Sequence, residues 1–290
     1  MSNNPGSLIK ALHALHVFFK SKPLLLRLAL TSLLFLPVLL SIGCAPSPGP
    51  ISRETPGPLN AEMIVSGIRD QEEIVSAFYT TGTVFFKDWK WRSEAHMLIA
   101  GIKAPYKIKI EITHPWGNPI LHILIDDDRI EILSFGEKKV YIGRLSHDSL
   151  SRFLPVKFIN RSLLWSILRG YPQILRYRGI GMQKMNRISL WGPKGREIEV
   201  IYLAPDSLQP EIVSFPEQEL MLTFKGLKEN RGIYYASEVG VKSAGEGKNL
   251  IIKNKDMVFN TRIPEPIFIL DKPPDFEVVY LDELPAGPGG

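Results

Sequence analysis

The feature that most constrains this chain is the strict alternation of apolar and charged residues in 105–113, PYKIKIEIT. In an extended strand, Tyr106, Ile108, Ile110 and Ile112 point to one face, and the charged residues between them point to the other. Such a strand is stable when its apolar face packs against other apolar elements. The stretch therefore predicts a sheet with one buried face and one polar face.

Similar strand-like runs are separated by short turns, which predicts an antiparallel meander. Two stretches, 60–78 and 160–170, instead carry apolar residues at helical spacing, each after a capping asparagine. One helix before the sheet and one in its middle can both cover a single apolar face. The predicted fold class is α+β, mainly β: an open antiparallel β-barrel of about 11 strands with helices covering its concave face. Such a fold either packs solid or encloses an apolar cavity, and the sequence does not decide between them.

Residues 1–43 have the composition of a secretory signal. Lys10, Lys20 and Lys22 form a basic stretch without acidic residues, and an uncharged apolar run follows from Leu28 to Gly43. This run is about 16 residues long and contains Pro37, whereas a membrane-spanning helix needs roughly 20 apolar residues. We therefore expect an export signal rather than a spanning helix.

Cys44 is the only cysteine of the chain, so no internal disulfide can form. The segment LSIGC that ends at Cys44 resembles a lipobox, although Ser41 stands where lipoproteins prefer leucine. We expect cleavage before Cys44 and lipidation of its thiol; the alternative is an uncleaved membrane anchor. Ala45 replaces the aspartate that is associated with retention in the inner membrane, which favours the outer membrane.

The rest of the chain divides into three parts by composition. Residues 44–58 form a lipidated, proline-rich tether, residues 59–254 a folded domain, and residues 255–290 a partly disordered C-terminal extension. Residues 1–43 hold four of the 35 basic residues and none of the 30 acidic ones, so the remaining chain is nearly neutral. A nucleic-acid-binding protein needs a basic face, which this balance does not supply. We expect a monomer.

No motif for catalysis or metal binding is evident. Outside the signal, the chain has four histidines at spacings that do not suit a shared metal ion, namely His96, His114, His122 and His147. The acidic triplet 126–128 lies between two strands and is typical of a solvated turn. We therefore predict no enzyme activity, no cofactor and no metal; only a hydrolase with catalytic residues dispersed along the chain escapes this search.

Trp116 stands out because it occupies the tip of a tight turn, between Pro115 and Gly117. A large aromatic side chain at such a tip either folds back onto the domain or projects outward. A projecting indole is suited to a membrane interface or to an acyl chain.

Residues 60–225 resemble the LolB family, outer-membrane lipoproteins that accept other lipoproteins from the periplasmic carrier LolA. The resemblance lies in the order of elements and in two motifs. Residues 113–117, THPWG, resemble the family's Asn-Pro-Leu-Gly turn, and residues 154–170 resemble its stretch from a proline to a Trp-Ile-Leu-Gly helix end. Here His114 replaces the family's asparagine and Trp116 its leucine.

The resemblance implies a half-barrel with an apolar cavity for acyl chains, and a turn at Trp116 that delivers cargo to the membrane. The expected partners are lipoprotein acyl chains, a LolA-type carrier and a membrane reached through the N-terminal lipid. The alternative is an envelope-assembly lipoprotein of the same fold that binds a lipid or a protein without transferring it. The residues expected to line the cavity are Tyr106, Ile108, Ile110, Ile112, Leu164, Trp165 and Leu168.

Overall fold

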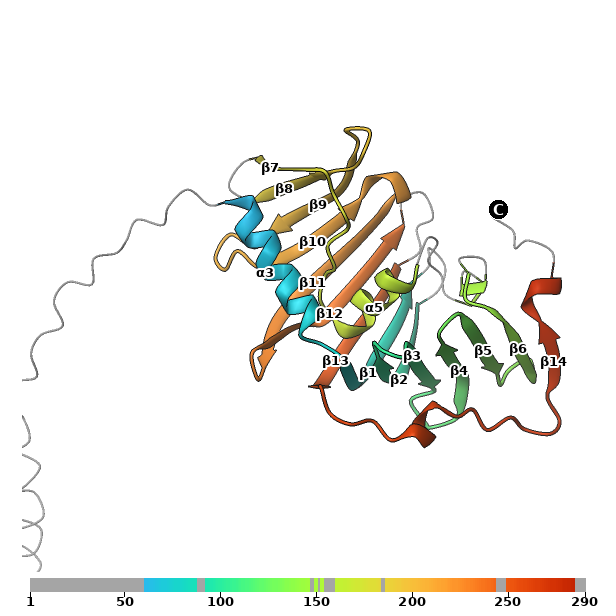
Figure 1. The fold of residues 1–290 in the computed structure, drawn as a ribbon. Helices are drawn as coiled ribbons and strands as arrows, with labels where there is room; N and C mark the ends of the chain where they lie inside the picture. Colours follow the sequence, from blue (N-terminus) through green and yellow to red (C-terminus); the bar gives the residue numbers. More distant parts are fainter. Residues whose placement is uncertain are drawn as a thin grey trace, which may run out of the picture. The chain divides into compact units, whose positions relative to one another are not determined.

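The computed structural model describes residues 60–87, 92–146, 149–150, 152–153, 160–183, 186–243 and 249–284. The signal, Cys44 and the tether up to residue 58 lie outside these residues. The described strands form one sheet in the order β14-β6-β5-β4-β3-β2-β1-β13-β12-β11-β10-β9-β8-β7 (Figure 1). Their bounds are β1 Ala77–Lys87, β2 Arg92–Ile102, β3 Lys107–Thr113, β4 Pro119–Asp126, β5 Arg129–Ser134, β6 Lys139–Arg144, β7 Gly179–Gln183, β8 Arg187–Trp191, β9 Glu197–Leu203, β10 Pro210–Phe215, β11 Leu220–Asn230, β12 Ile233–Ser243, β13 Asn249–Phe259 and β14 Glu277–Tyr280.

The sheet is open, because β14 and β7 each pair on one side only. Every neighbouring pair is antiparallel except β14 and β6, which are parallel. The predicted mainly β class and the open antiparallel sheet are thus confirmed. The predicted count of about 11 strands is too low, since the sheet has 14.

Two helices, α3 (Ala61–Glu73) and α5 (Arg161–Arg169), lie on the same side of the sheet (Figure 1). The prediction of one helix over 60–78 is wrong at its end, because β1 already begins at Ala77. The aromatic and β-branched run from Phe78 onward favours a strand. Phe78 pairs there with residues of β2 and β13, and its ring packs edge-on against Trp165.

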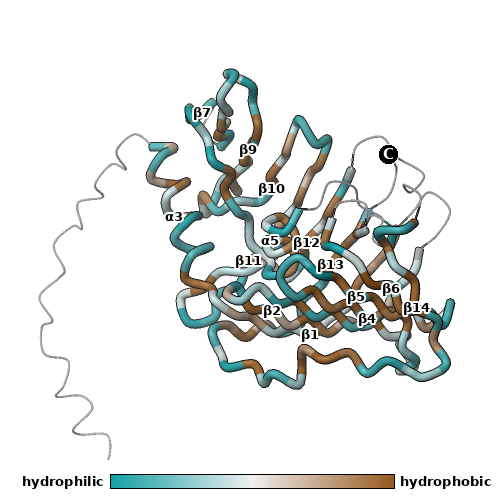
Figure 2. Tube along the Cα trace, turned by 45° about the vertical axis from the view of Figure 1, so that its right-hand side comes forward, coloured by the Kyte–Doolittle hydropathy of each residue, from teal (hydrophilic) through white to brown (hydrophobic). Residues whose placement is uncertain are grey.

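The main core lies between the inner face of the sheet and the two helices. Ile108, Ile110 and Ile112 of β3 are buried in it, as the period of two predicts. Figure 2 shows the same alternation of hydrophobic and hydrophilic positions along other strands. Alternate residues of each strand, which are mostly apolar, therefore point toward the helices.

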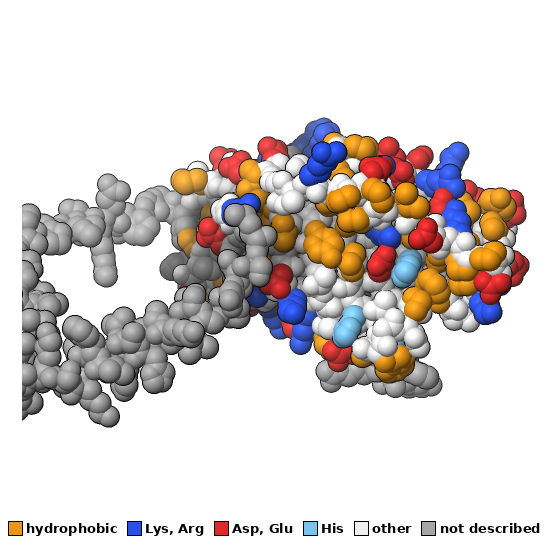
Figure 3. Space-filling model, turned by 90° about the horizontal axis from the view of Figure 1, so that it is seen from below, with side chains coloured by type: hydrophobic (Ala, Val, Ile, Leu, Met, Phe, Trp, Pro, Cys, Tyr) orange, Lys and Arg blue, Asp and Glu red, His pale blue; other side chains and the backbone are white. Residues whose placement is uncertain are grey.

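A second apolar cluster lies outside this core and combines buried residues of β5 and β6 with the C-terminal stretch. It consists of Leu133, Val140 and Leu270, flanked by Leu124, Phe135, Ile142 and Phe276. The outer face is thus not polar throughout, and Figure 3 shows hydrophobic side chains among charges of both signs on one face of the molecule. The C-terminal residues cover apolar surface that β5 and β6 would otherwise expose.

Residues beyond 254 extend the sheet and pack against it. The boundary expected after residue 254 falls inside β13, and β14 pairs with β6 at the edge of the sheet. Leu281 joins the main core close to Gly143, where an added Cβ would lie 2.7 Å from the Cβ of Leu281. Residues 285–290, the end of the extension, lie outside the described residues.

The second cluster makes the C-terminal stretch part of the fold's stability. Leu270→Ala is expected to lower the free energy of unfolding by about 2 kcal/mol, because it leaves a gap against Leu133 and Val140. The control is Ile269→Ala, since Ile269 is 55% exposed and its loss should cost no more than about 0.5 kcal/mol. Chemical denaturation of both variants measures the difference; equal stabilities would show that the C-terminal stretch contributes nothing.

Candidate functional site

The helix α5 is short and almost wholly buried. The side chain of Asn160 accepts a hydrogen bond from the backbone N–H of Leu163 (2.8 Å), which caps the first turn. Gly170 ends the helix in the left-handed region (φ 73°), and its carbonyl accepts a hydrogen bond from the N–H of Ala236 on β12. Every residue from Leu163 to Arg169 is buried. The helix is therefore held between the sheet and the rest of the domain.

An apolar cavity of about 30 Å³ lies between α5 and the sheet. It is lined by Val84, Phe86, Met97, Ile99, Ile110, Ile112, Leu164, Ile167, Leu168, Leu250 and Ile252. This volume suits only one or two water molecules, and a cavity without polar groups stays dry. The inner space is thus neither solid nor large enough for an acyl chain unless α5 or its neighbours move.

Four of the seven residues expected to line a cavity do line this one, namely Ile110, Ile112, Leu164 and Leu168. The other three, Tyr106, Ile108 and Trp165, are buried elsewhere in the core. Most remaining lining residues come in pairs two positions apart on β1, β2 and β13. The period of two along those strands is the signal that identifies them, but only the strand order brings them under α5.

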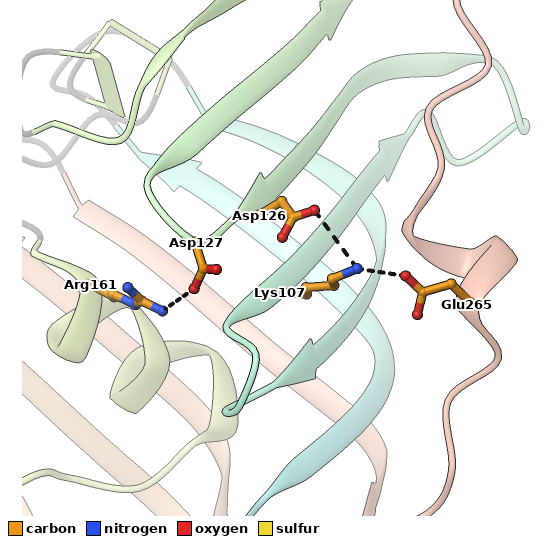
Figure 4. Close-up of polar contacts among 5 residues, drawn as sticks. All are labelled: Lys107, Asp126, Asp127, Arg161 and Glu265. Carbon is orange, nitrogen blue, oxygen red and sulfur yellow. Dashed lines mark hydrogen bonds and ion pairs between the residues drawn. The ribbon is translucent and has the colours of Figure 1, made fainter.

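The N-terminal end of α5 is held by polar contacts with the turns of the sheet (Figure 4). Arg161 forms an ion pair with Asp127 of the β4–β5 turn (Nη2–Oδ1 3.0 Å), and its guanidinium lies 3.9 Å from the centre of the Tyr106 ring. The Tyr106 hydroxyl donates to the Arg161 carbonyl (3.0 Å), and burial raises the pKa of this tyrosine. The ion pair is partly exposed, so it contributes less than about 1 kcal/mol.

The same turn also contacts the C-terminal stretch. Lys107 lies between Asp126 (3.7 Å) and Glu265 (2.5 Å), as Figure 4 shows. Hydrogen bonding to Glu265 raises the pKa of Lys107. The acidic triplet 126–128 is thus a turn, as predicted, and two of its carboxylates form ion pairs on either side of β3.

The C-terminal end of α5 differs, because its charged residue is fully buried. Arg169 donates from Nη2 to the carbonyl of Gln71 on α3 (2.8 Å), and its guanidinium lies 4.9 Å from the centre of the Tyr171 ring. Its Nε and Nη1 have no hydrogen-bond partner among the described residues. Burial lowers the pKa of Arg169 to about 10. Sequence analysis did not identify this residue, since an arginine at the end of a helix is ordinary.

Glu199 is a second buried ionisable residue, and it contacts the chain at Leu175, beyond the end of α5. It lies on β9, faces inward, and accepts a hydrogen bond at Oε2 from the N–H of Leu175 (2.8 Å). Its Oε1 has no partner among the described residues. Burial raises the pKa of Glu199 to about 8, with a contribution from Glu72 on α3, while Arg69 on α3 opposes the shift. Glu199 is therefore mostly protonated at neutral pH.

Trp116 projects from the β3–β4 hairpin and is 71% exposed. The turn is closed by the N–H of Gly117, which donates to the His114 carbonyl (2.8 Å). The His114 and Trp116 rings stack with their centres 4.6 Å apart and their planes 6° from parallel. Of the two orientations left open by the sequence, the indole takes the outward one.

The remaining sequence features do not form a site among the described residues. His122 packs against Phe135, and burial lowers its pKa. No group of three metal-ligating side chains comes together in the described part of the chain. A larger depression of about 500 Å³ opens at the β1–β13 bulge, but it is lined mainly by polar residues such as Thr81, His96 and Lys253. None of the described helices is long and apolar enough to cross a membrane.

Comparison with known proteins supports the architecture. No family model matches the sequence, and no curated protein is similar to it. A DUF1329 family protein from Desulfovibrio piger has a similar structure (TM-score 0.52, 12% identity, 72% of this chain and 97% of that chain). An outer membrane lipoprotein-sorting protein domain from Vibrio parahaemolyticus is similar at a TM-score of 0.50 (16% identity, 72% and 97%).

A LolA superfamily protein from Nitrosomonas europaea aligns with a TM-score of 0.48 (14% identity, 73% and 99%). At 12% and 16% identity, the similarities to the Desulfovibrio piger and Vibrio parahaemolyticus proteins show the fold alone. The mainly β fold, an open antiparallel sheet with two helices on one side, is thus one that a lipoprotein-sorting protein domain also has.

The buried carboxyl of Glu199 predicts a pH-dependent stability. Its pKa is about 8 in the folded protein and near 4.5 in the unfolded chain. Folding therefore takes up a proton when the pH lies between 4.5 and 8. The contribution of Glu199 to the free energy of unfolding is fully present below pH 4.5 and is lost as the pH rises to about 8. Between pH 4.5 and 8, the free energy of unfolding of the wild type should fall by about 1 kcal/mol per pH unit relative to that of Glu199→Gln. Denaturant unfolding at pH 5 to 9 measures this difference, and a constant difference would contradict the assignment.

Proposed function

We propose that this protein is a lipid-anchored lipoprotein of the outer membrane, on its periplasmic face, that binds acyl chains beneath α5. The observation that carries the proposal is the cavity between α5 and the sheet, because all of its lining side chains are apolar. An acyl chain has the same chemistry as this lining and gains about 0.8 kcal/mol for each CH₂ that leaves water. The anchor is the lipid on Cys44, reached through the tether 44–58.

Entry of a chain requires α5 to move away from the sheet. At its N-terminal end the helix is held by the partly exposed pair of Arg161 and Asp127, which contributes little free energy. Moving α5 exposes Leu164 and Leu168, but an incoming chain covers them again. The closed helix and the bound chain thus compete for the same apolar surface.

The transfer role extends this binding role. Acylated proteins would arrive from a LolA-type carrier, their chains would pass beneath α5, and Trp116 would lead them into the bilayer. The exposure of Trp116 supports this step, since an indole at a hairpin tip enters a membrane interface readily. None of these three steps needs a cofactor, a metal or catalytic chemistry.

The alternative function is lipid or protein binding in envelope assembly, without transfer. The observation that favours it is the small volume of the cavity, about 30 Å³, which leaves no room for a chain unless α5 moves. The rate at which a labelled acylated protein passes from a carrier to vesicles separates the two functions. A protein that transfers acylated proteins raises this rate, whereas one that only binds a lipid or a protein does not.

The size of the cavity should control binding of a chain. Leu168→Ala enlarges the cavity and is expected to raise the affinity for a photoactivatable palmitate analogue, while it lowers the free energy of unfolding by about 2–5 kcal/mol. The control is Leu190→Ala on β8, which is equally buried but outside the cavity, so that it loses stability without gaining affinity. Crosslinking yield against analogue concentration measures the affinity. Equal affinities of both variants and the wild type would refute binding at this cavity.

The turn at Trp116 should matter for delivery alone. Trp116→Glu is expected to lower the rate of transfer into vesicles at least about tenfold, because a charge at the tip opposes entry into the membrane. Met63→Glu is the matched control, since Met63 on α3 is also 71% exposed. Binding of the palmitate analogue should be unchanged in both variants. Transfer at the wild-type rate by Trp116→Glu would remove Trp116 from the proposal.

A further inference from the structure

The segment from α5 to residue 175 carries an unusual group of buried donors. Trp165, Arg169 and Gln173 are each at least nine-tenths buried, and the atoms Trp165 Nε1, Arg169 Nε and Nη1, and Gln173 Nε2 lack an acceptor among the described residues. A buried polar group without a partner costs about as much as a lost hydrogen bond, so such groups are rare in folded proteins. Several on one short segment indicate a function.

All of these free atoms are donors. An arginine side chain has five N–H donors, and among the described residues the side chain of Arg169 makes one hydrogen bond, from Nη2 to the Gln71 carbonyl. Glu199, whose Oε2 accepts from Leu175, is mostly protonated at neutral pH and then adds a donor rather than an acceptor. The group therefore calls for a ligand that supplies acceptor oxygens and no donors.

The charge of Arg169 narrows the ligand further. Arg169 forms no ion pair among the described residues; the acidic side chain that acts on it, Glu72 on α3, does so only at longer range. A buried cation without an anionic partner is costly, and an anionic oxygen group relieves that cost. A carboxylate or a phosphate fits better than a neutral ester.

Two of the three donor residues and three of the residues that line the cavity belong to α5. Leu164, Ile167 and Leu168 line the cavity, and Trp165 and Arg169 lie on the adjacent stripe of α5, one turn apart. A chain that enters the cavity therefore comes within one helical turn of the donors on α5. A ligand with a long apolar chain and an oxygen-rich end would satisfy both.

We propose that Arg169, Gln173 and Trp165 form a binding site for the anionic end of an acyl lipid, a carboxylate or a phosphate, whose chain lies in the cavity beneath α5. This inference rests on the proposed function and specifies its ligand as an acidic acyl lipid. An oxygen of the ligand accepts from Arg169 Nη1, which keeps the hydrogen bond from Nη2 to the Gln71 carbonyl in place.

The test uses the full-length protein in one detergent at fixed concentration, crosslinked to the photoactivatable palmitate analogue. The competitors are palmitate, 1-palmitoyl-lysophosphatidate and methyl palmitate, which share a chain and differ in the polar end. For the wild type, the anionic competitor that matches the site should be at least about tenfold stronger than methyl palmitate. Whether palmitate or lysophosphatidate is the stronger identifies the source as a free fatty acid or a lipid headgroup.

Arg169→Met should abolish this preference and leave competition by methyl palmitate unchanged. Arg161→Met is the matched control, because Arg161 is on the same helix but exposed and already paired with Asp127. Gln173→Met, expected to weaken the preference about threefold, replaces Arg169→Met if that variant fails to fold.

Two results would overturn the inference. Equal competition by all three lipids in the wild type would mean that only the chain is recognised, and the proposed function would survive. An undiminished preference in both Arg169→Met and Gln173→Met would place recognition elsewhere. Competition by none of the lipids would instead refute the proposed function itself.

Discussion

The structure depends on covering the inner face of a wide sheet with very little helix. Fourteen strands place apolar side chains at alternate positions on this face, and α3 and α5 are the α-helices among the described elements that lie over it. Seven of the nine residues of α5 are therefore buried, and a small gap remains beneath the helix. Because interiors pack densely, the side chains that line this gap lack some of the contacts that a filled core would give them.

The two ends of α5 are held by different kinds of contact. Arg161 and Asp127 meet where water reaches them, so their separation costs little free energy. Arg169 is inaccessible to water, makes one hydrogen bond to α3, and has further donors without partners in the described chain. The two ends of α5 thus differ in polar contacts: the N-terminal end has a partly exposed ion pair, and the C-terminal end has a buried guanidinium with unpaired donors among the described residues. This difference is a reason for a helix so short to be retained with a buried charge.

Sequence patterns predicted the local structure well wherever one residue type decided it. The alternation in β3, the caps Asn160 and Gly170, and the turn at 126–128 follow from properties of single residues and their neighbours. The end of α3 was mispredicted because Val75 and Phe78 fit helical spacing, while pairing with β2 and β13 makes Phe78 a strand residue. Competition between local spacing and long-range pairing is not visible in a short window.

The sequence by itself determined a mainly β chain with one apolar face, two covering helices, and an aromatic residue at the tip of a turn. Only the tertiary structure decided which side chains meet beneath α5, because β1, β2 and β13 are neighbours through pairing between residues far apart in the chain. It also decided that Arg169 and Glu199 are buried, since burial depends on what packs over a residue and not on its type. Periodicity fixes the direction of a side chain, whereas the strand order fixes what that side chain contacts.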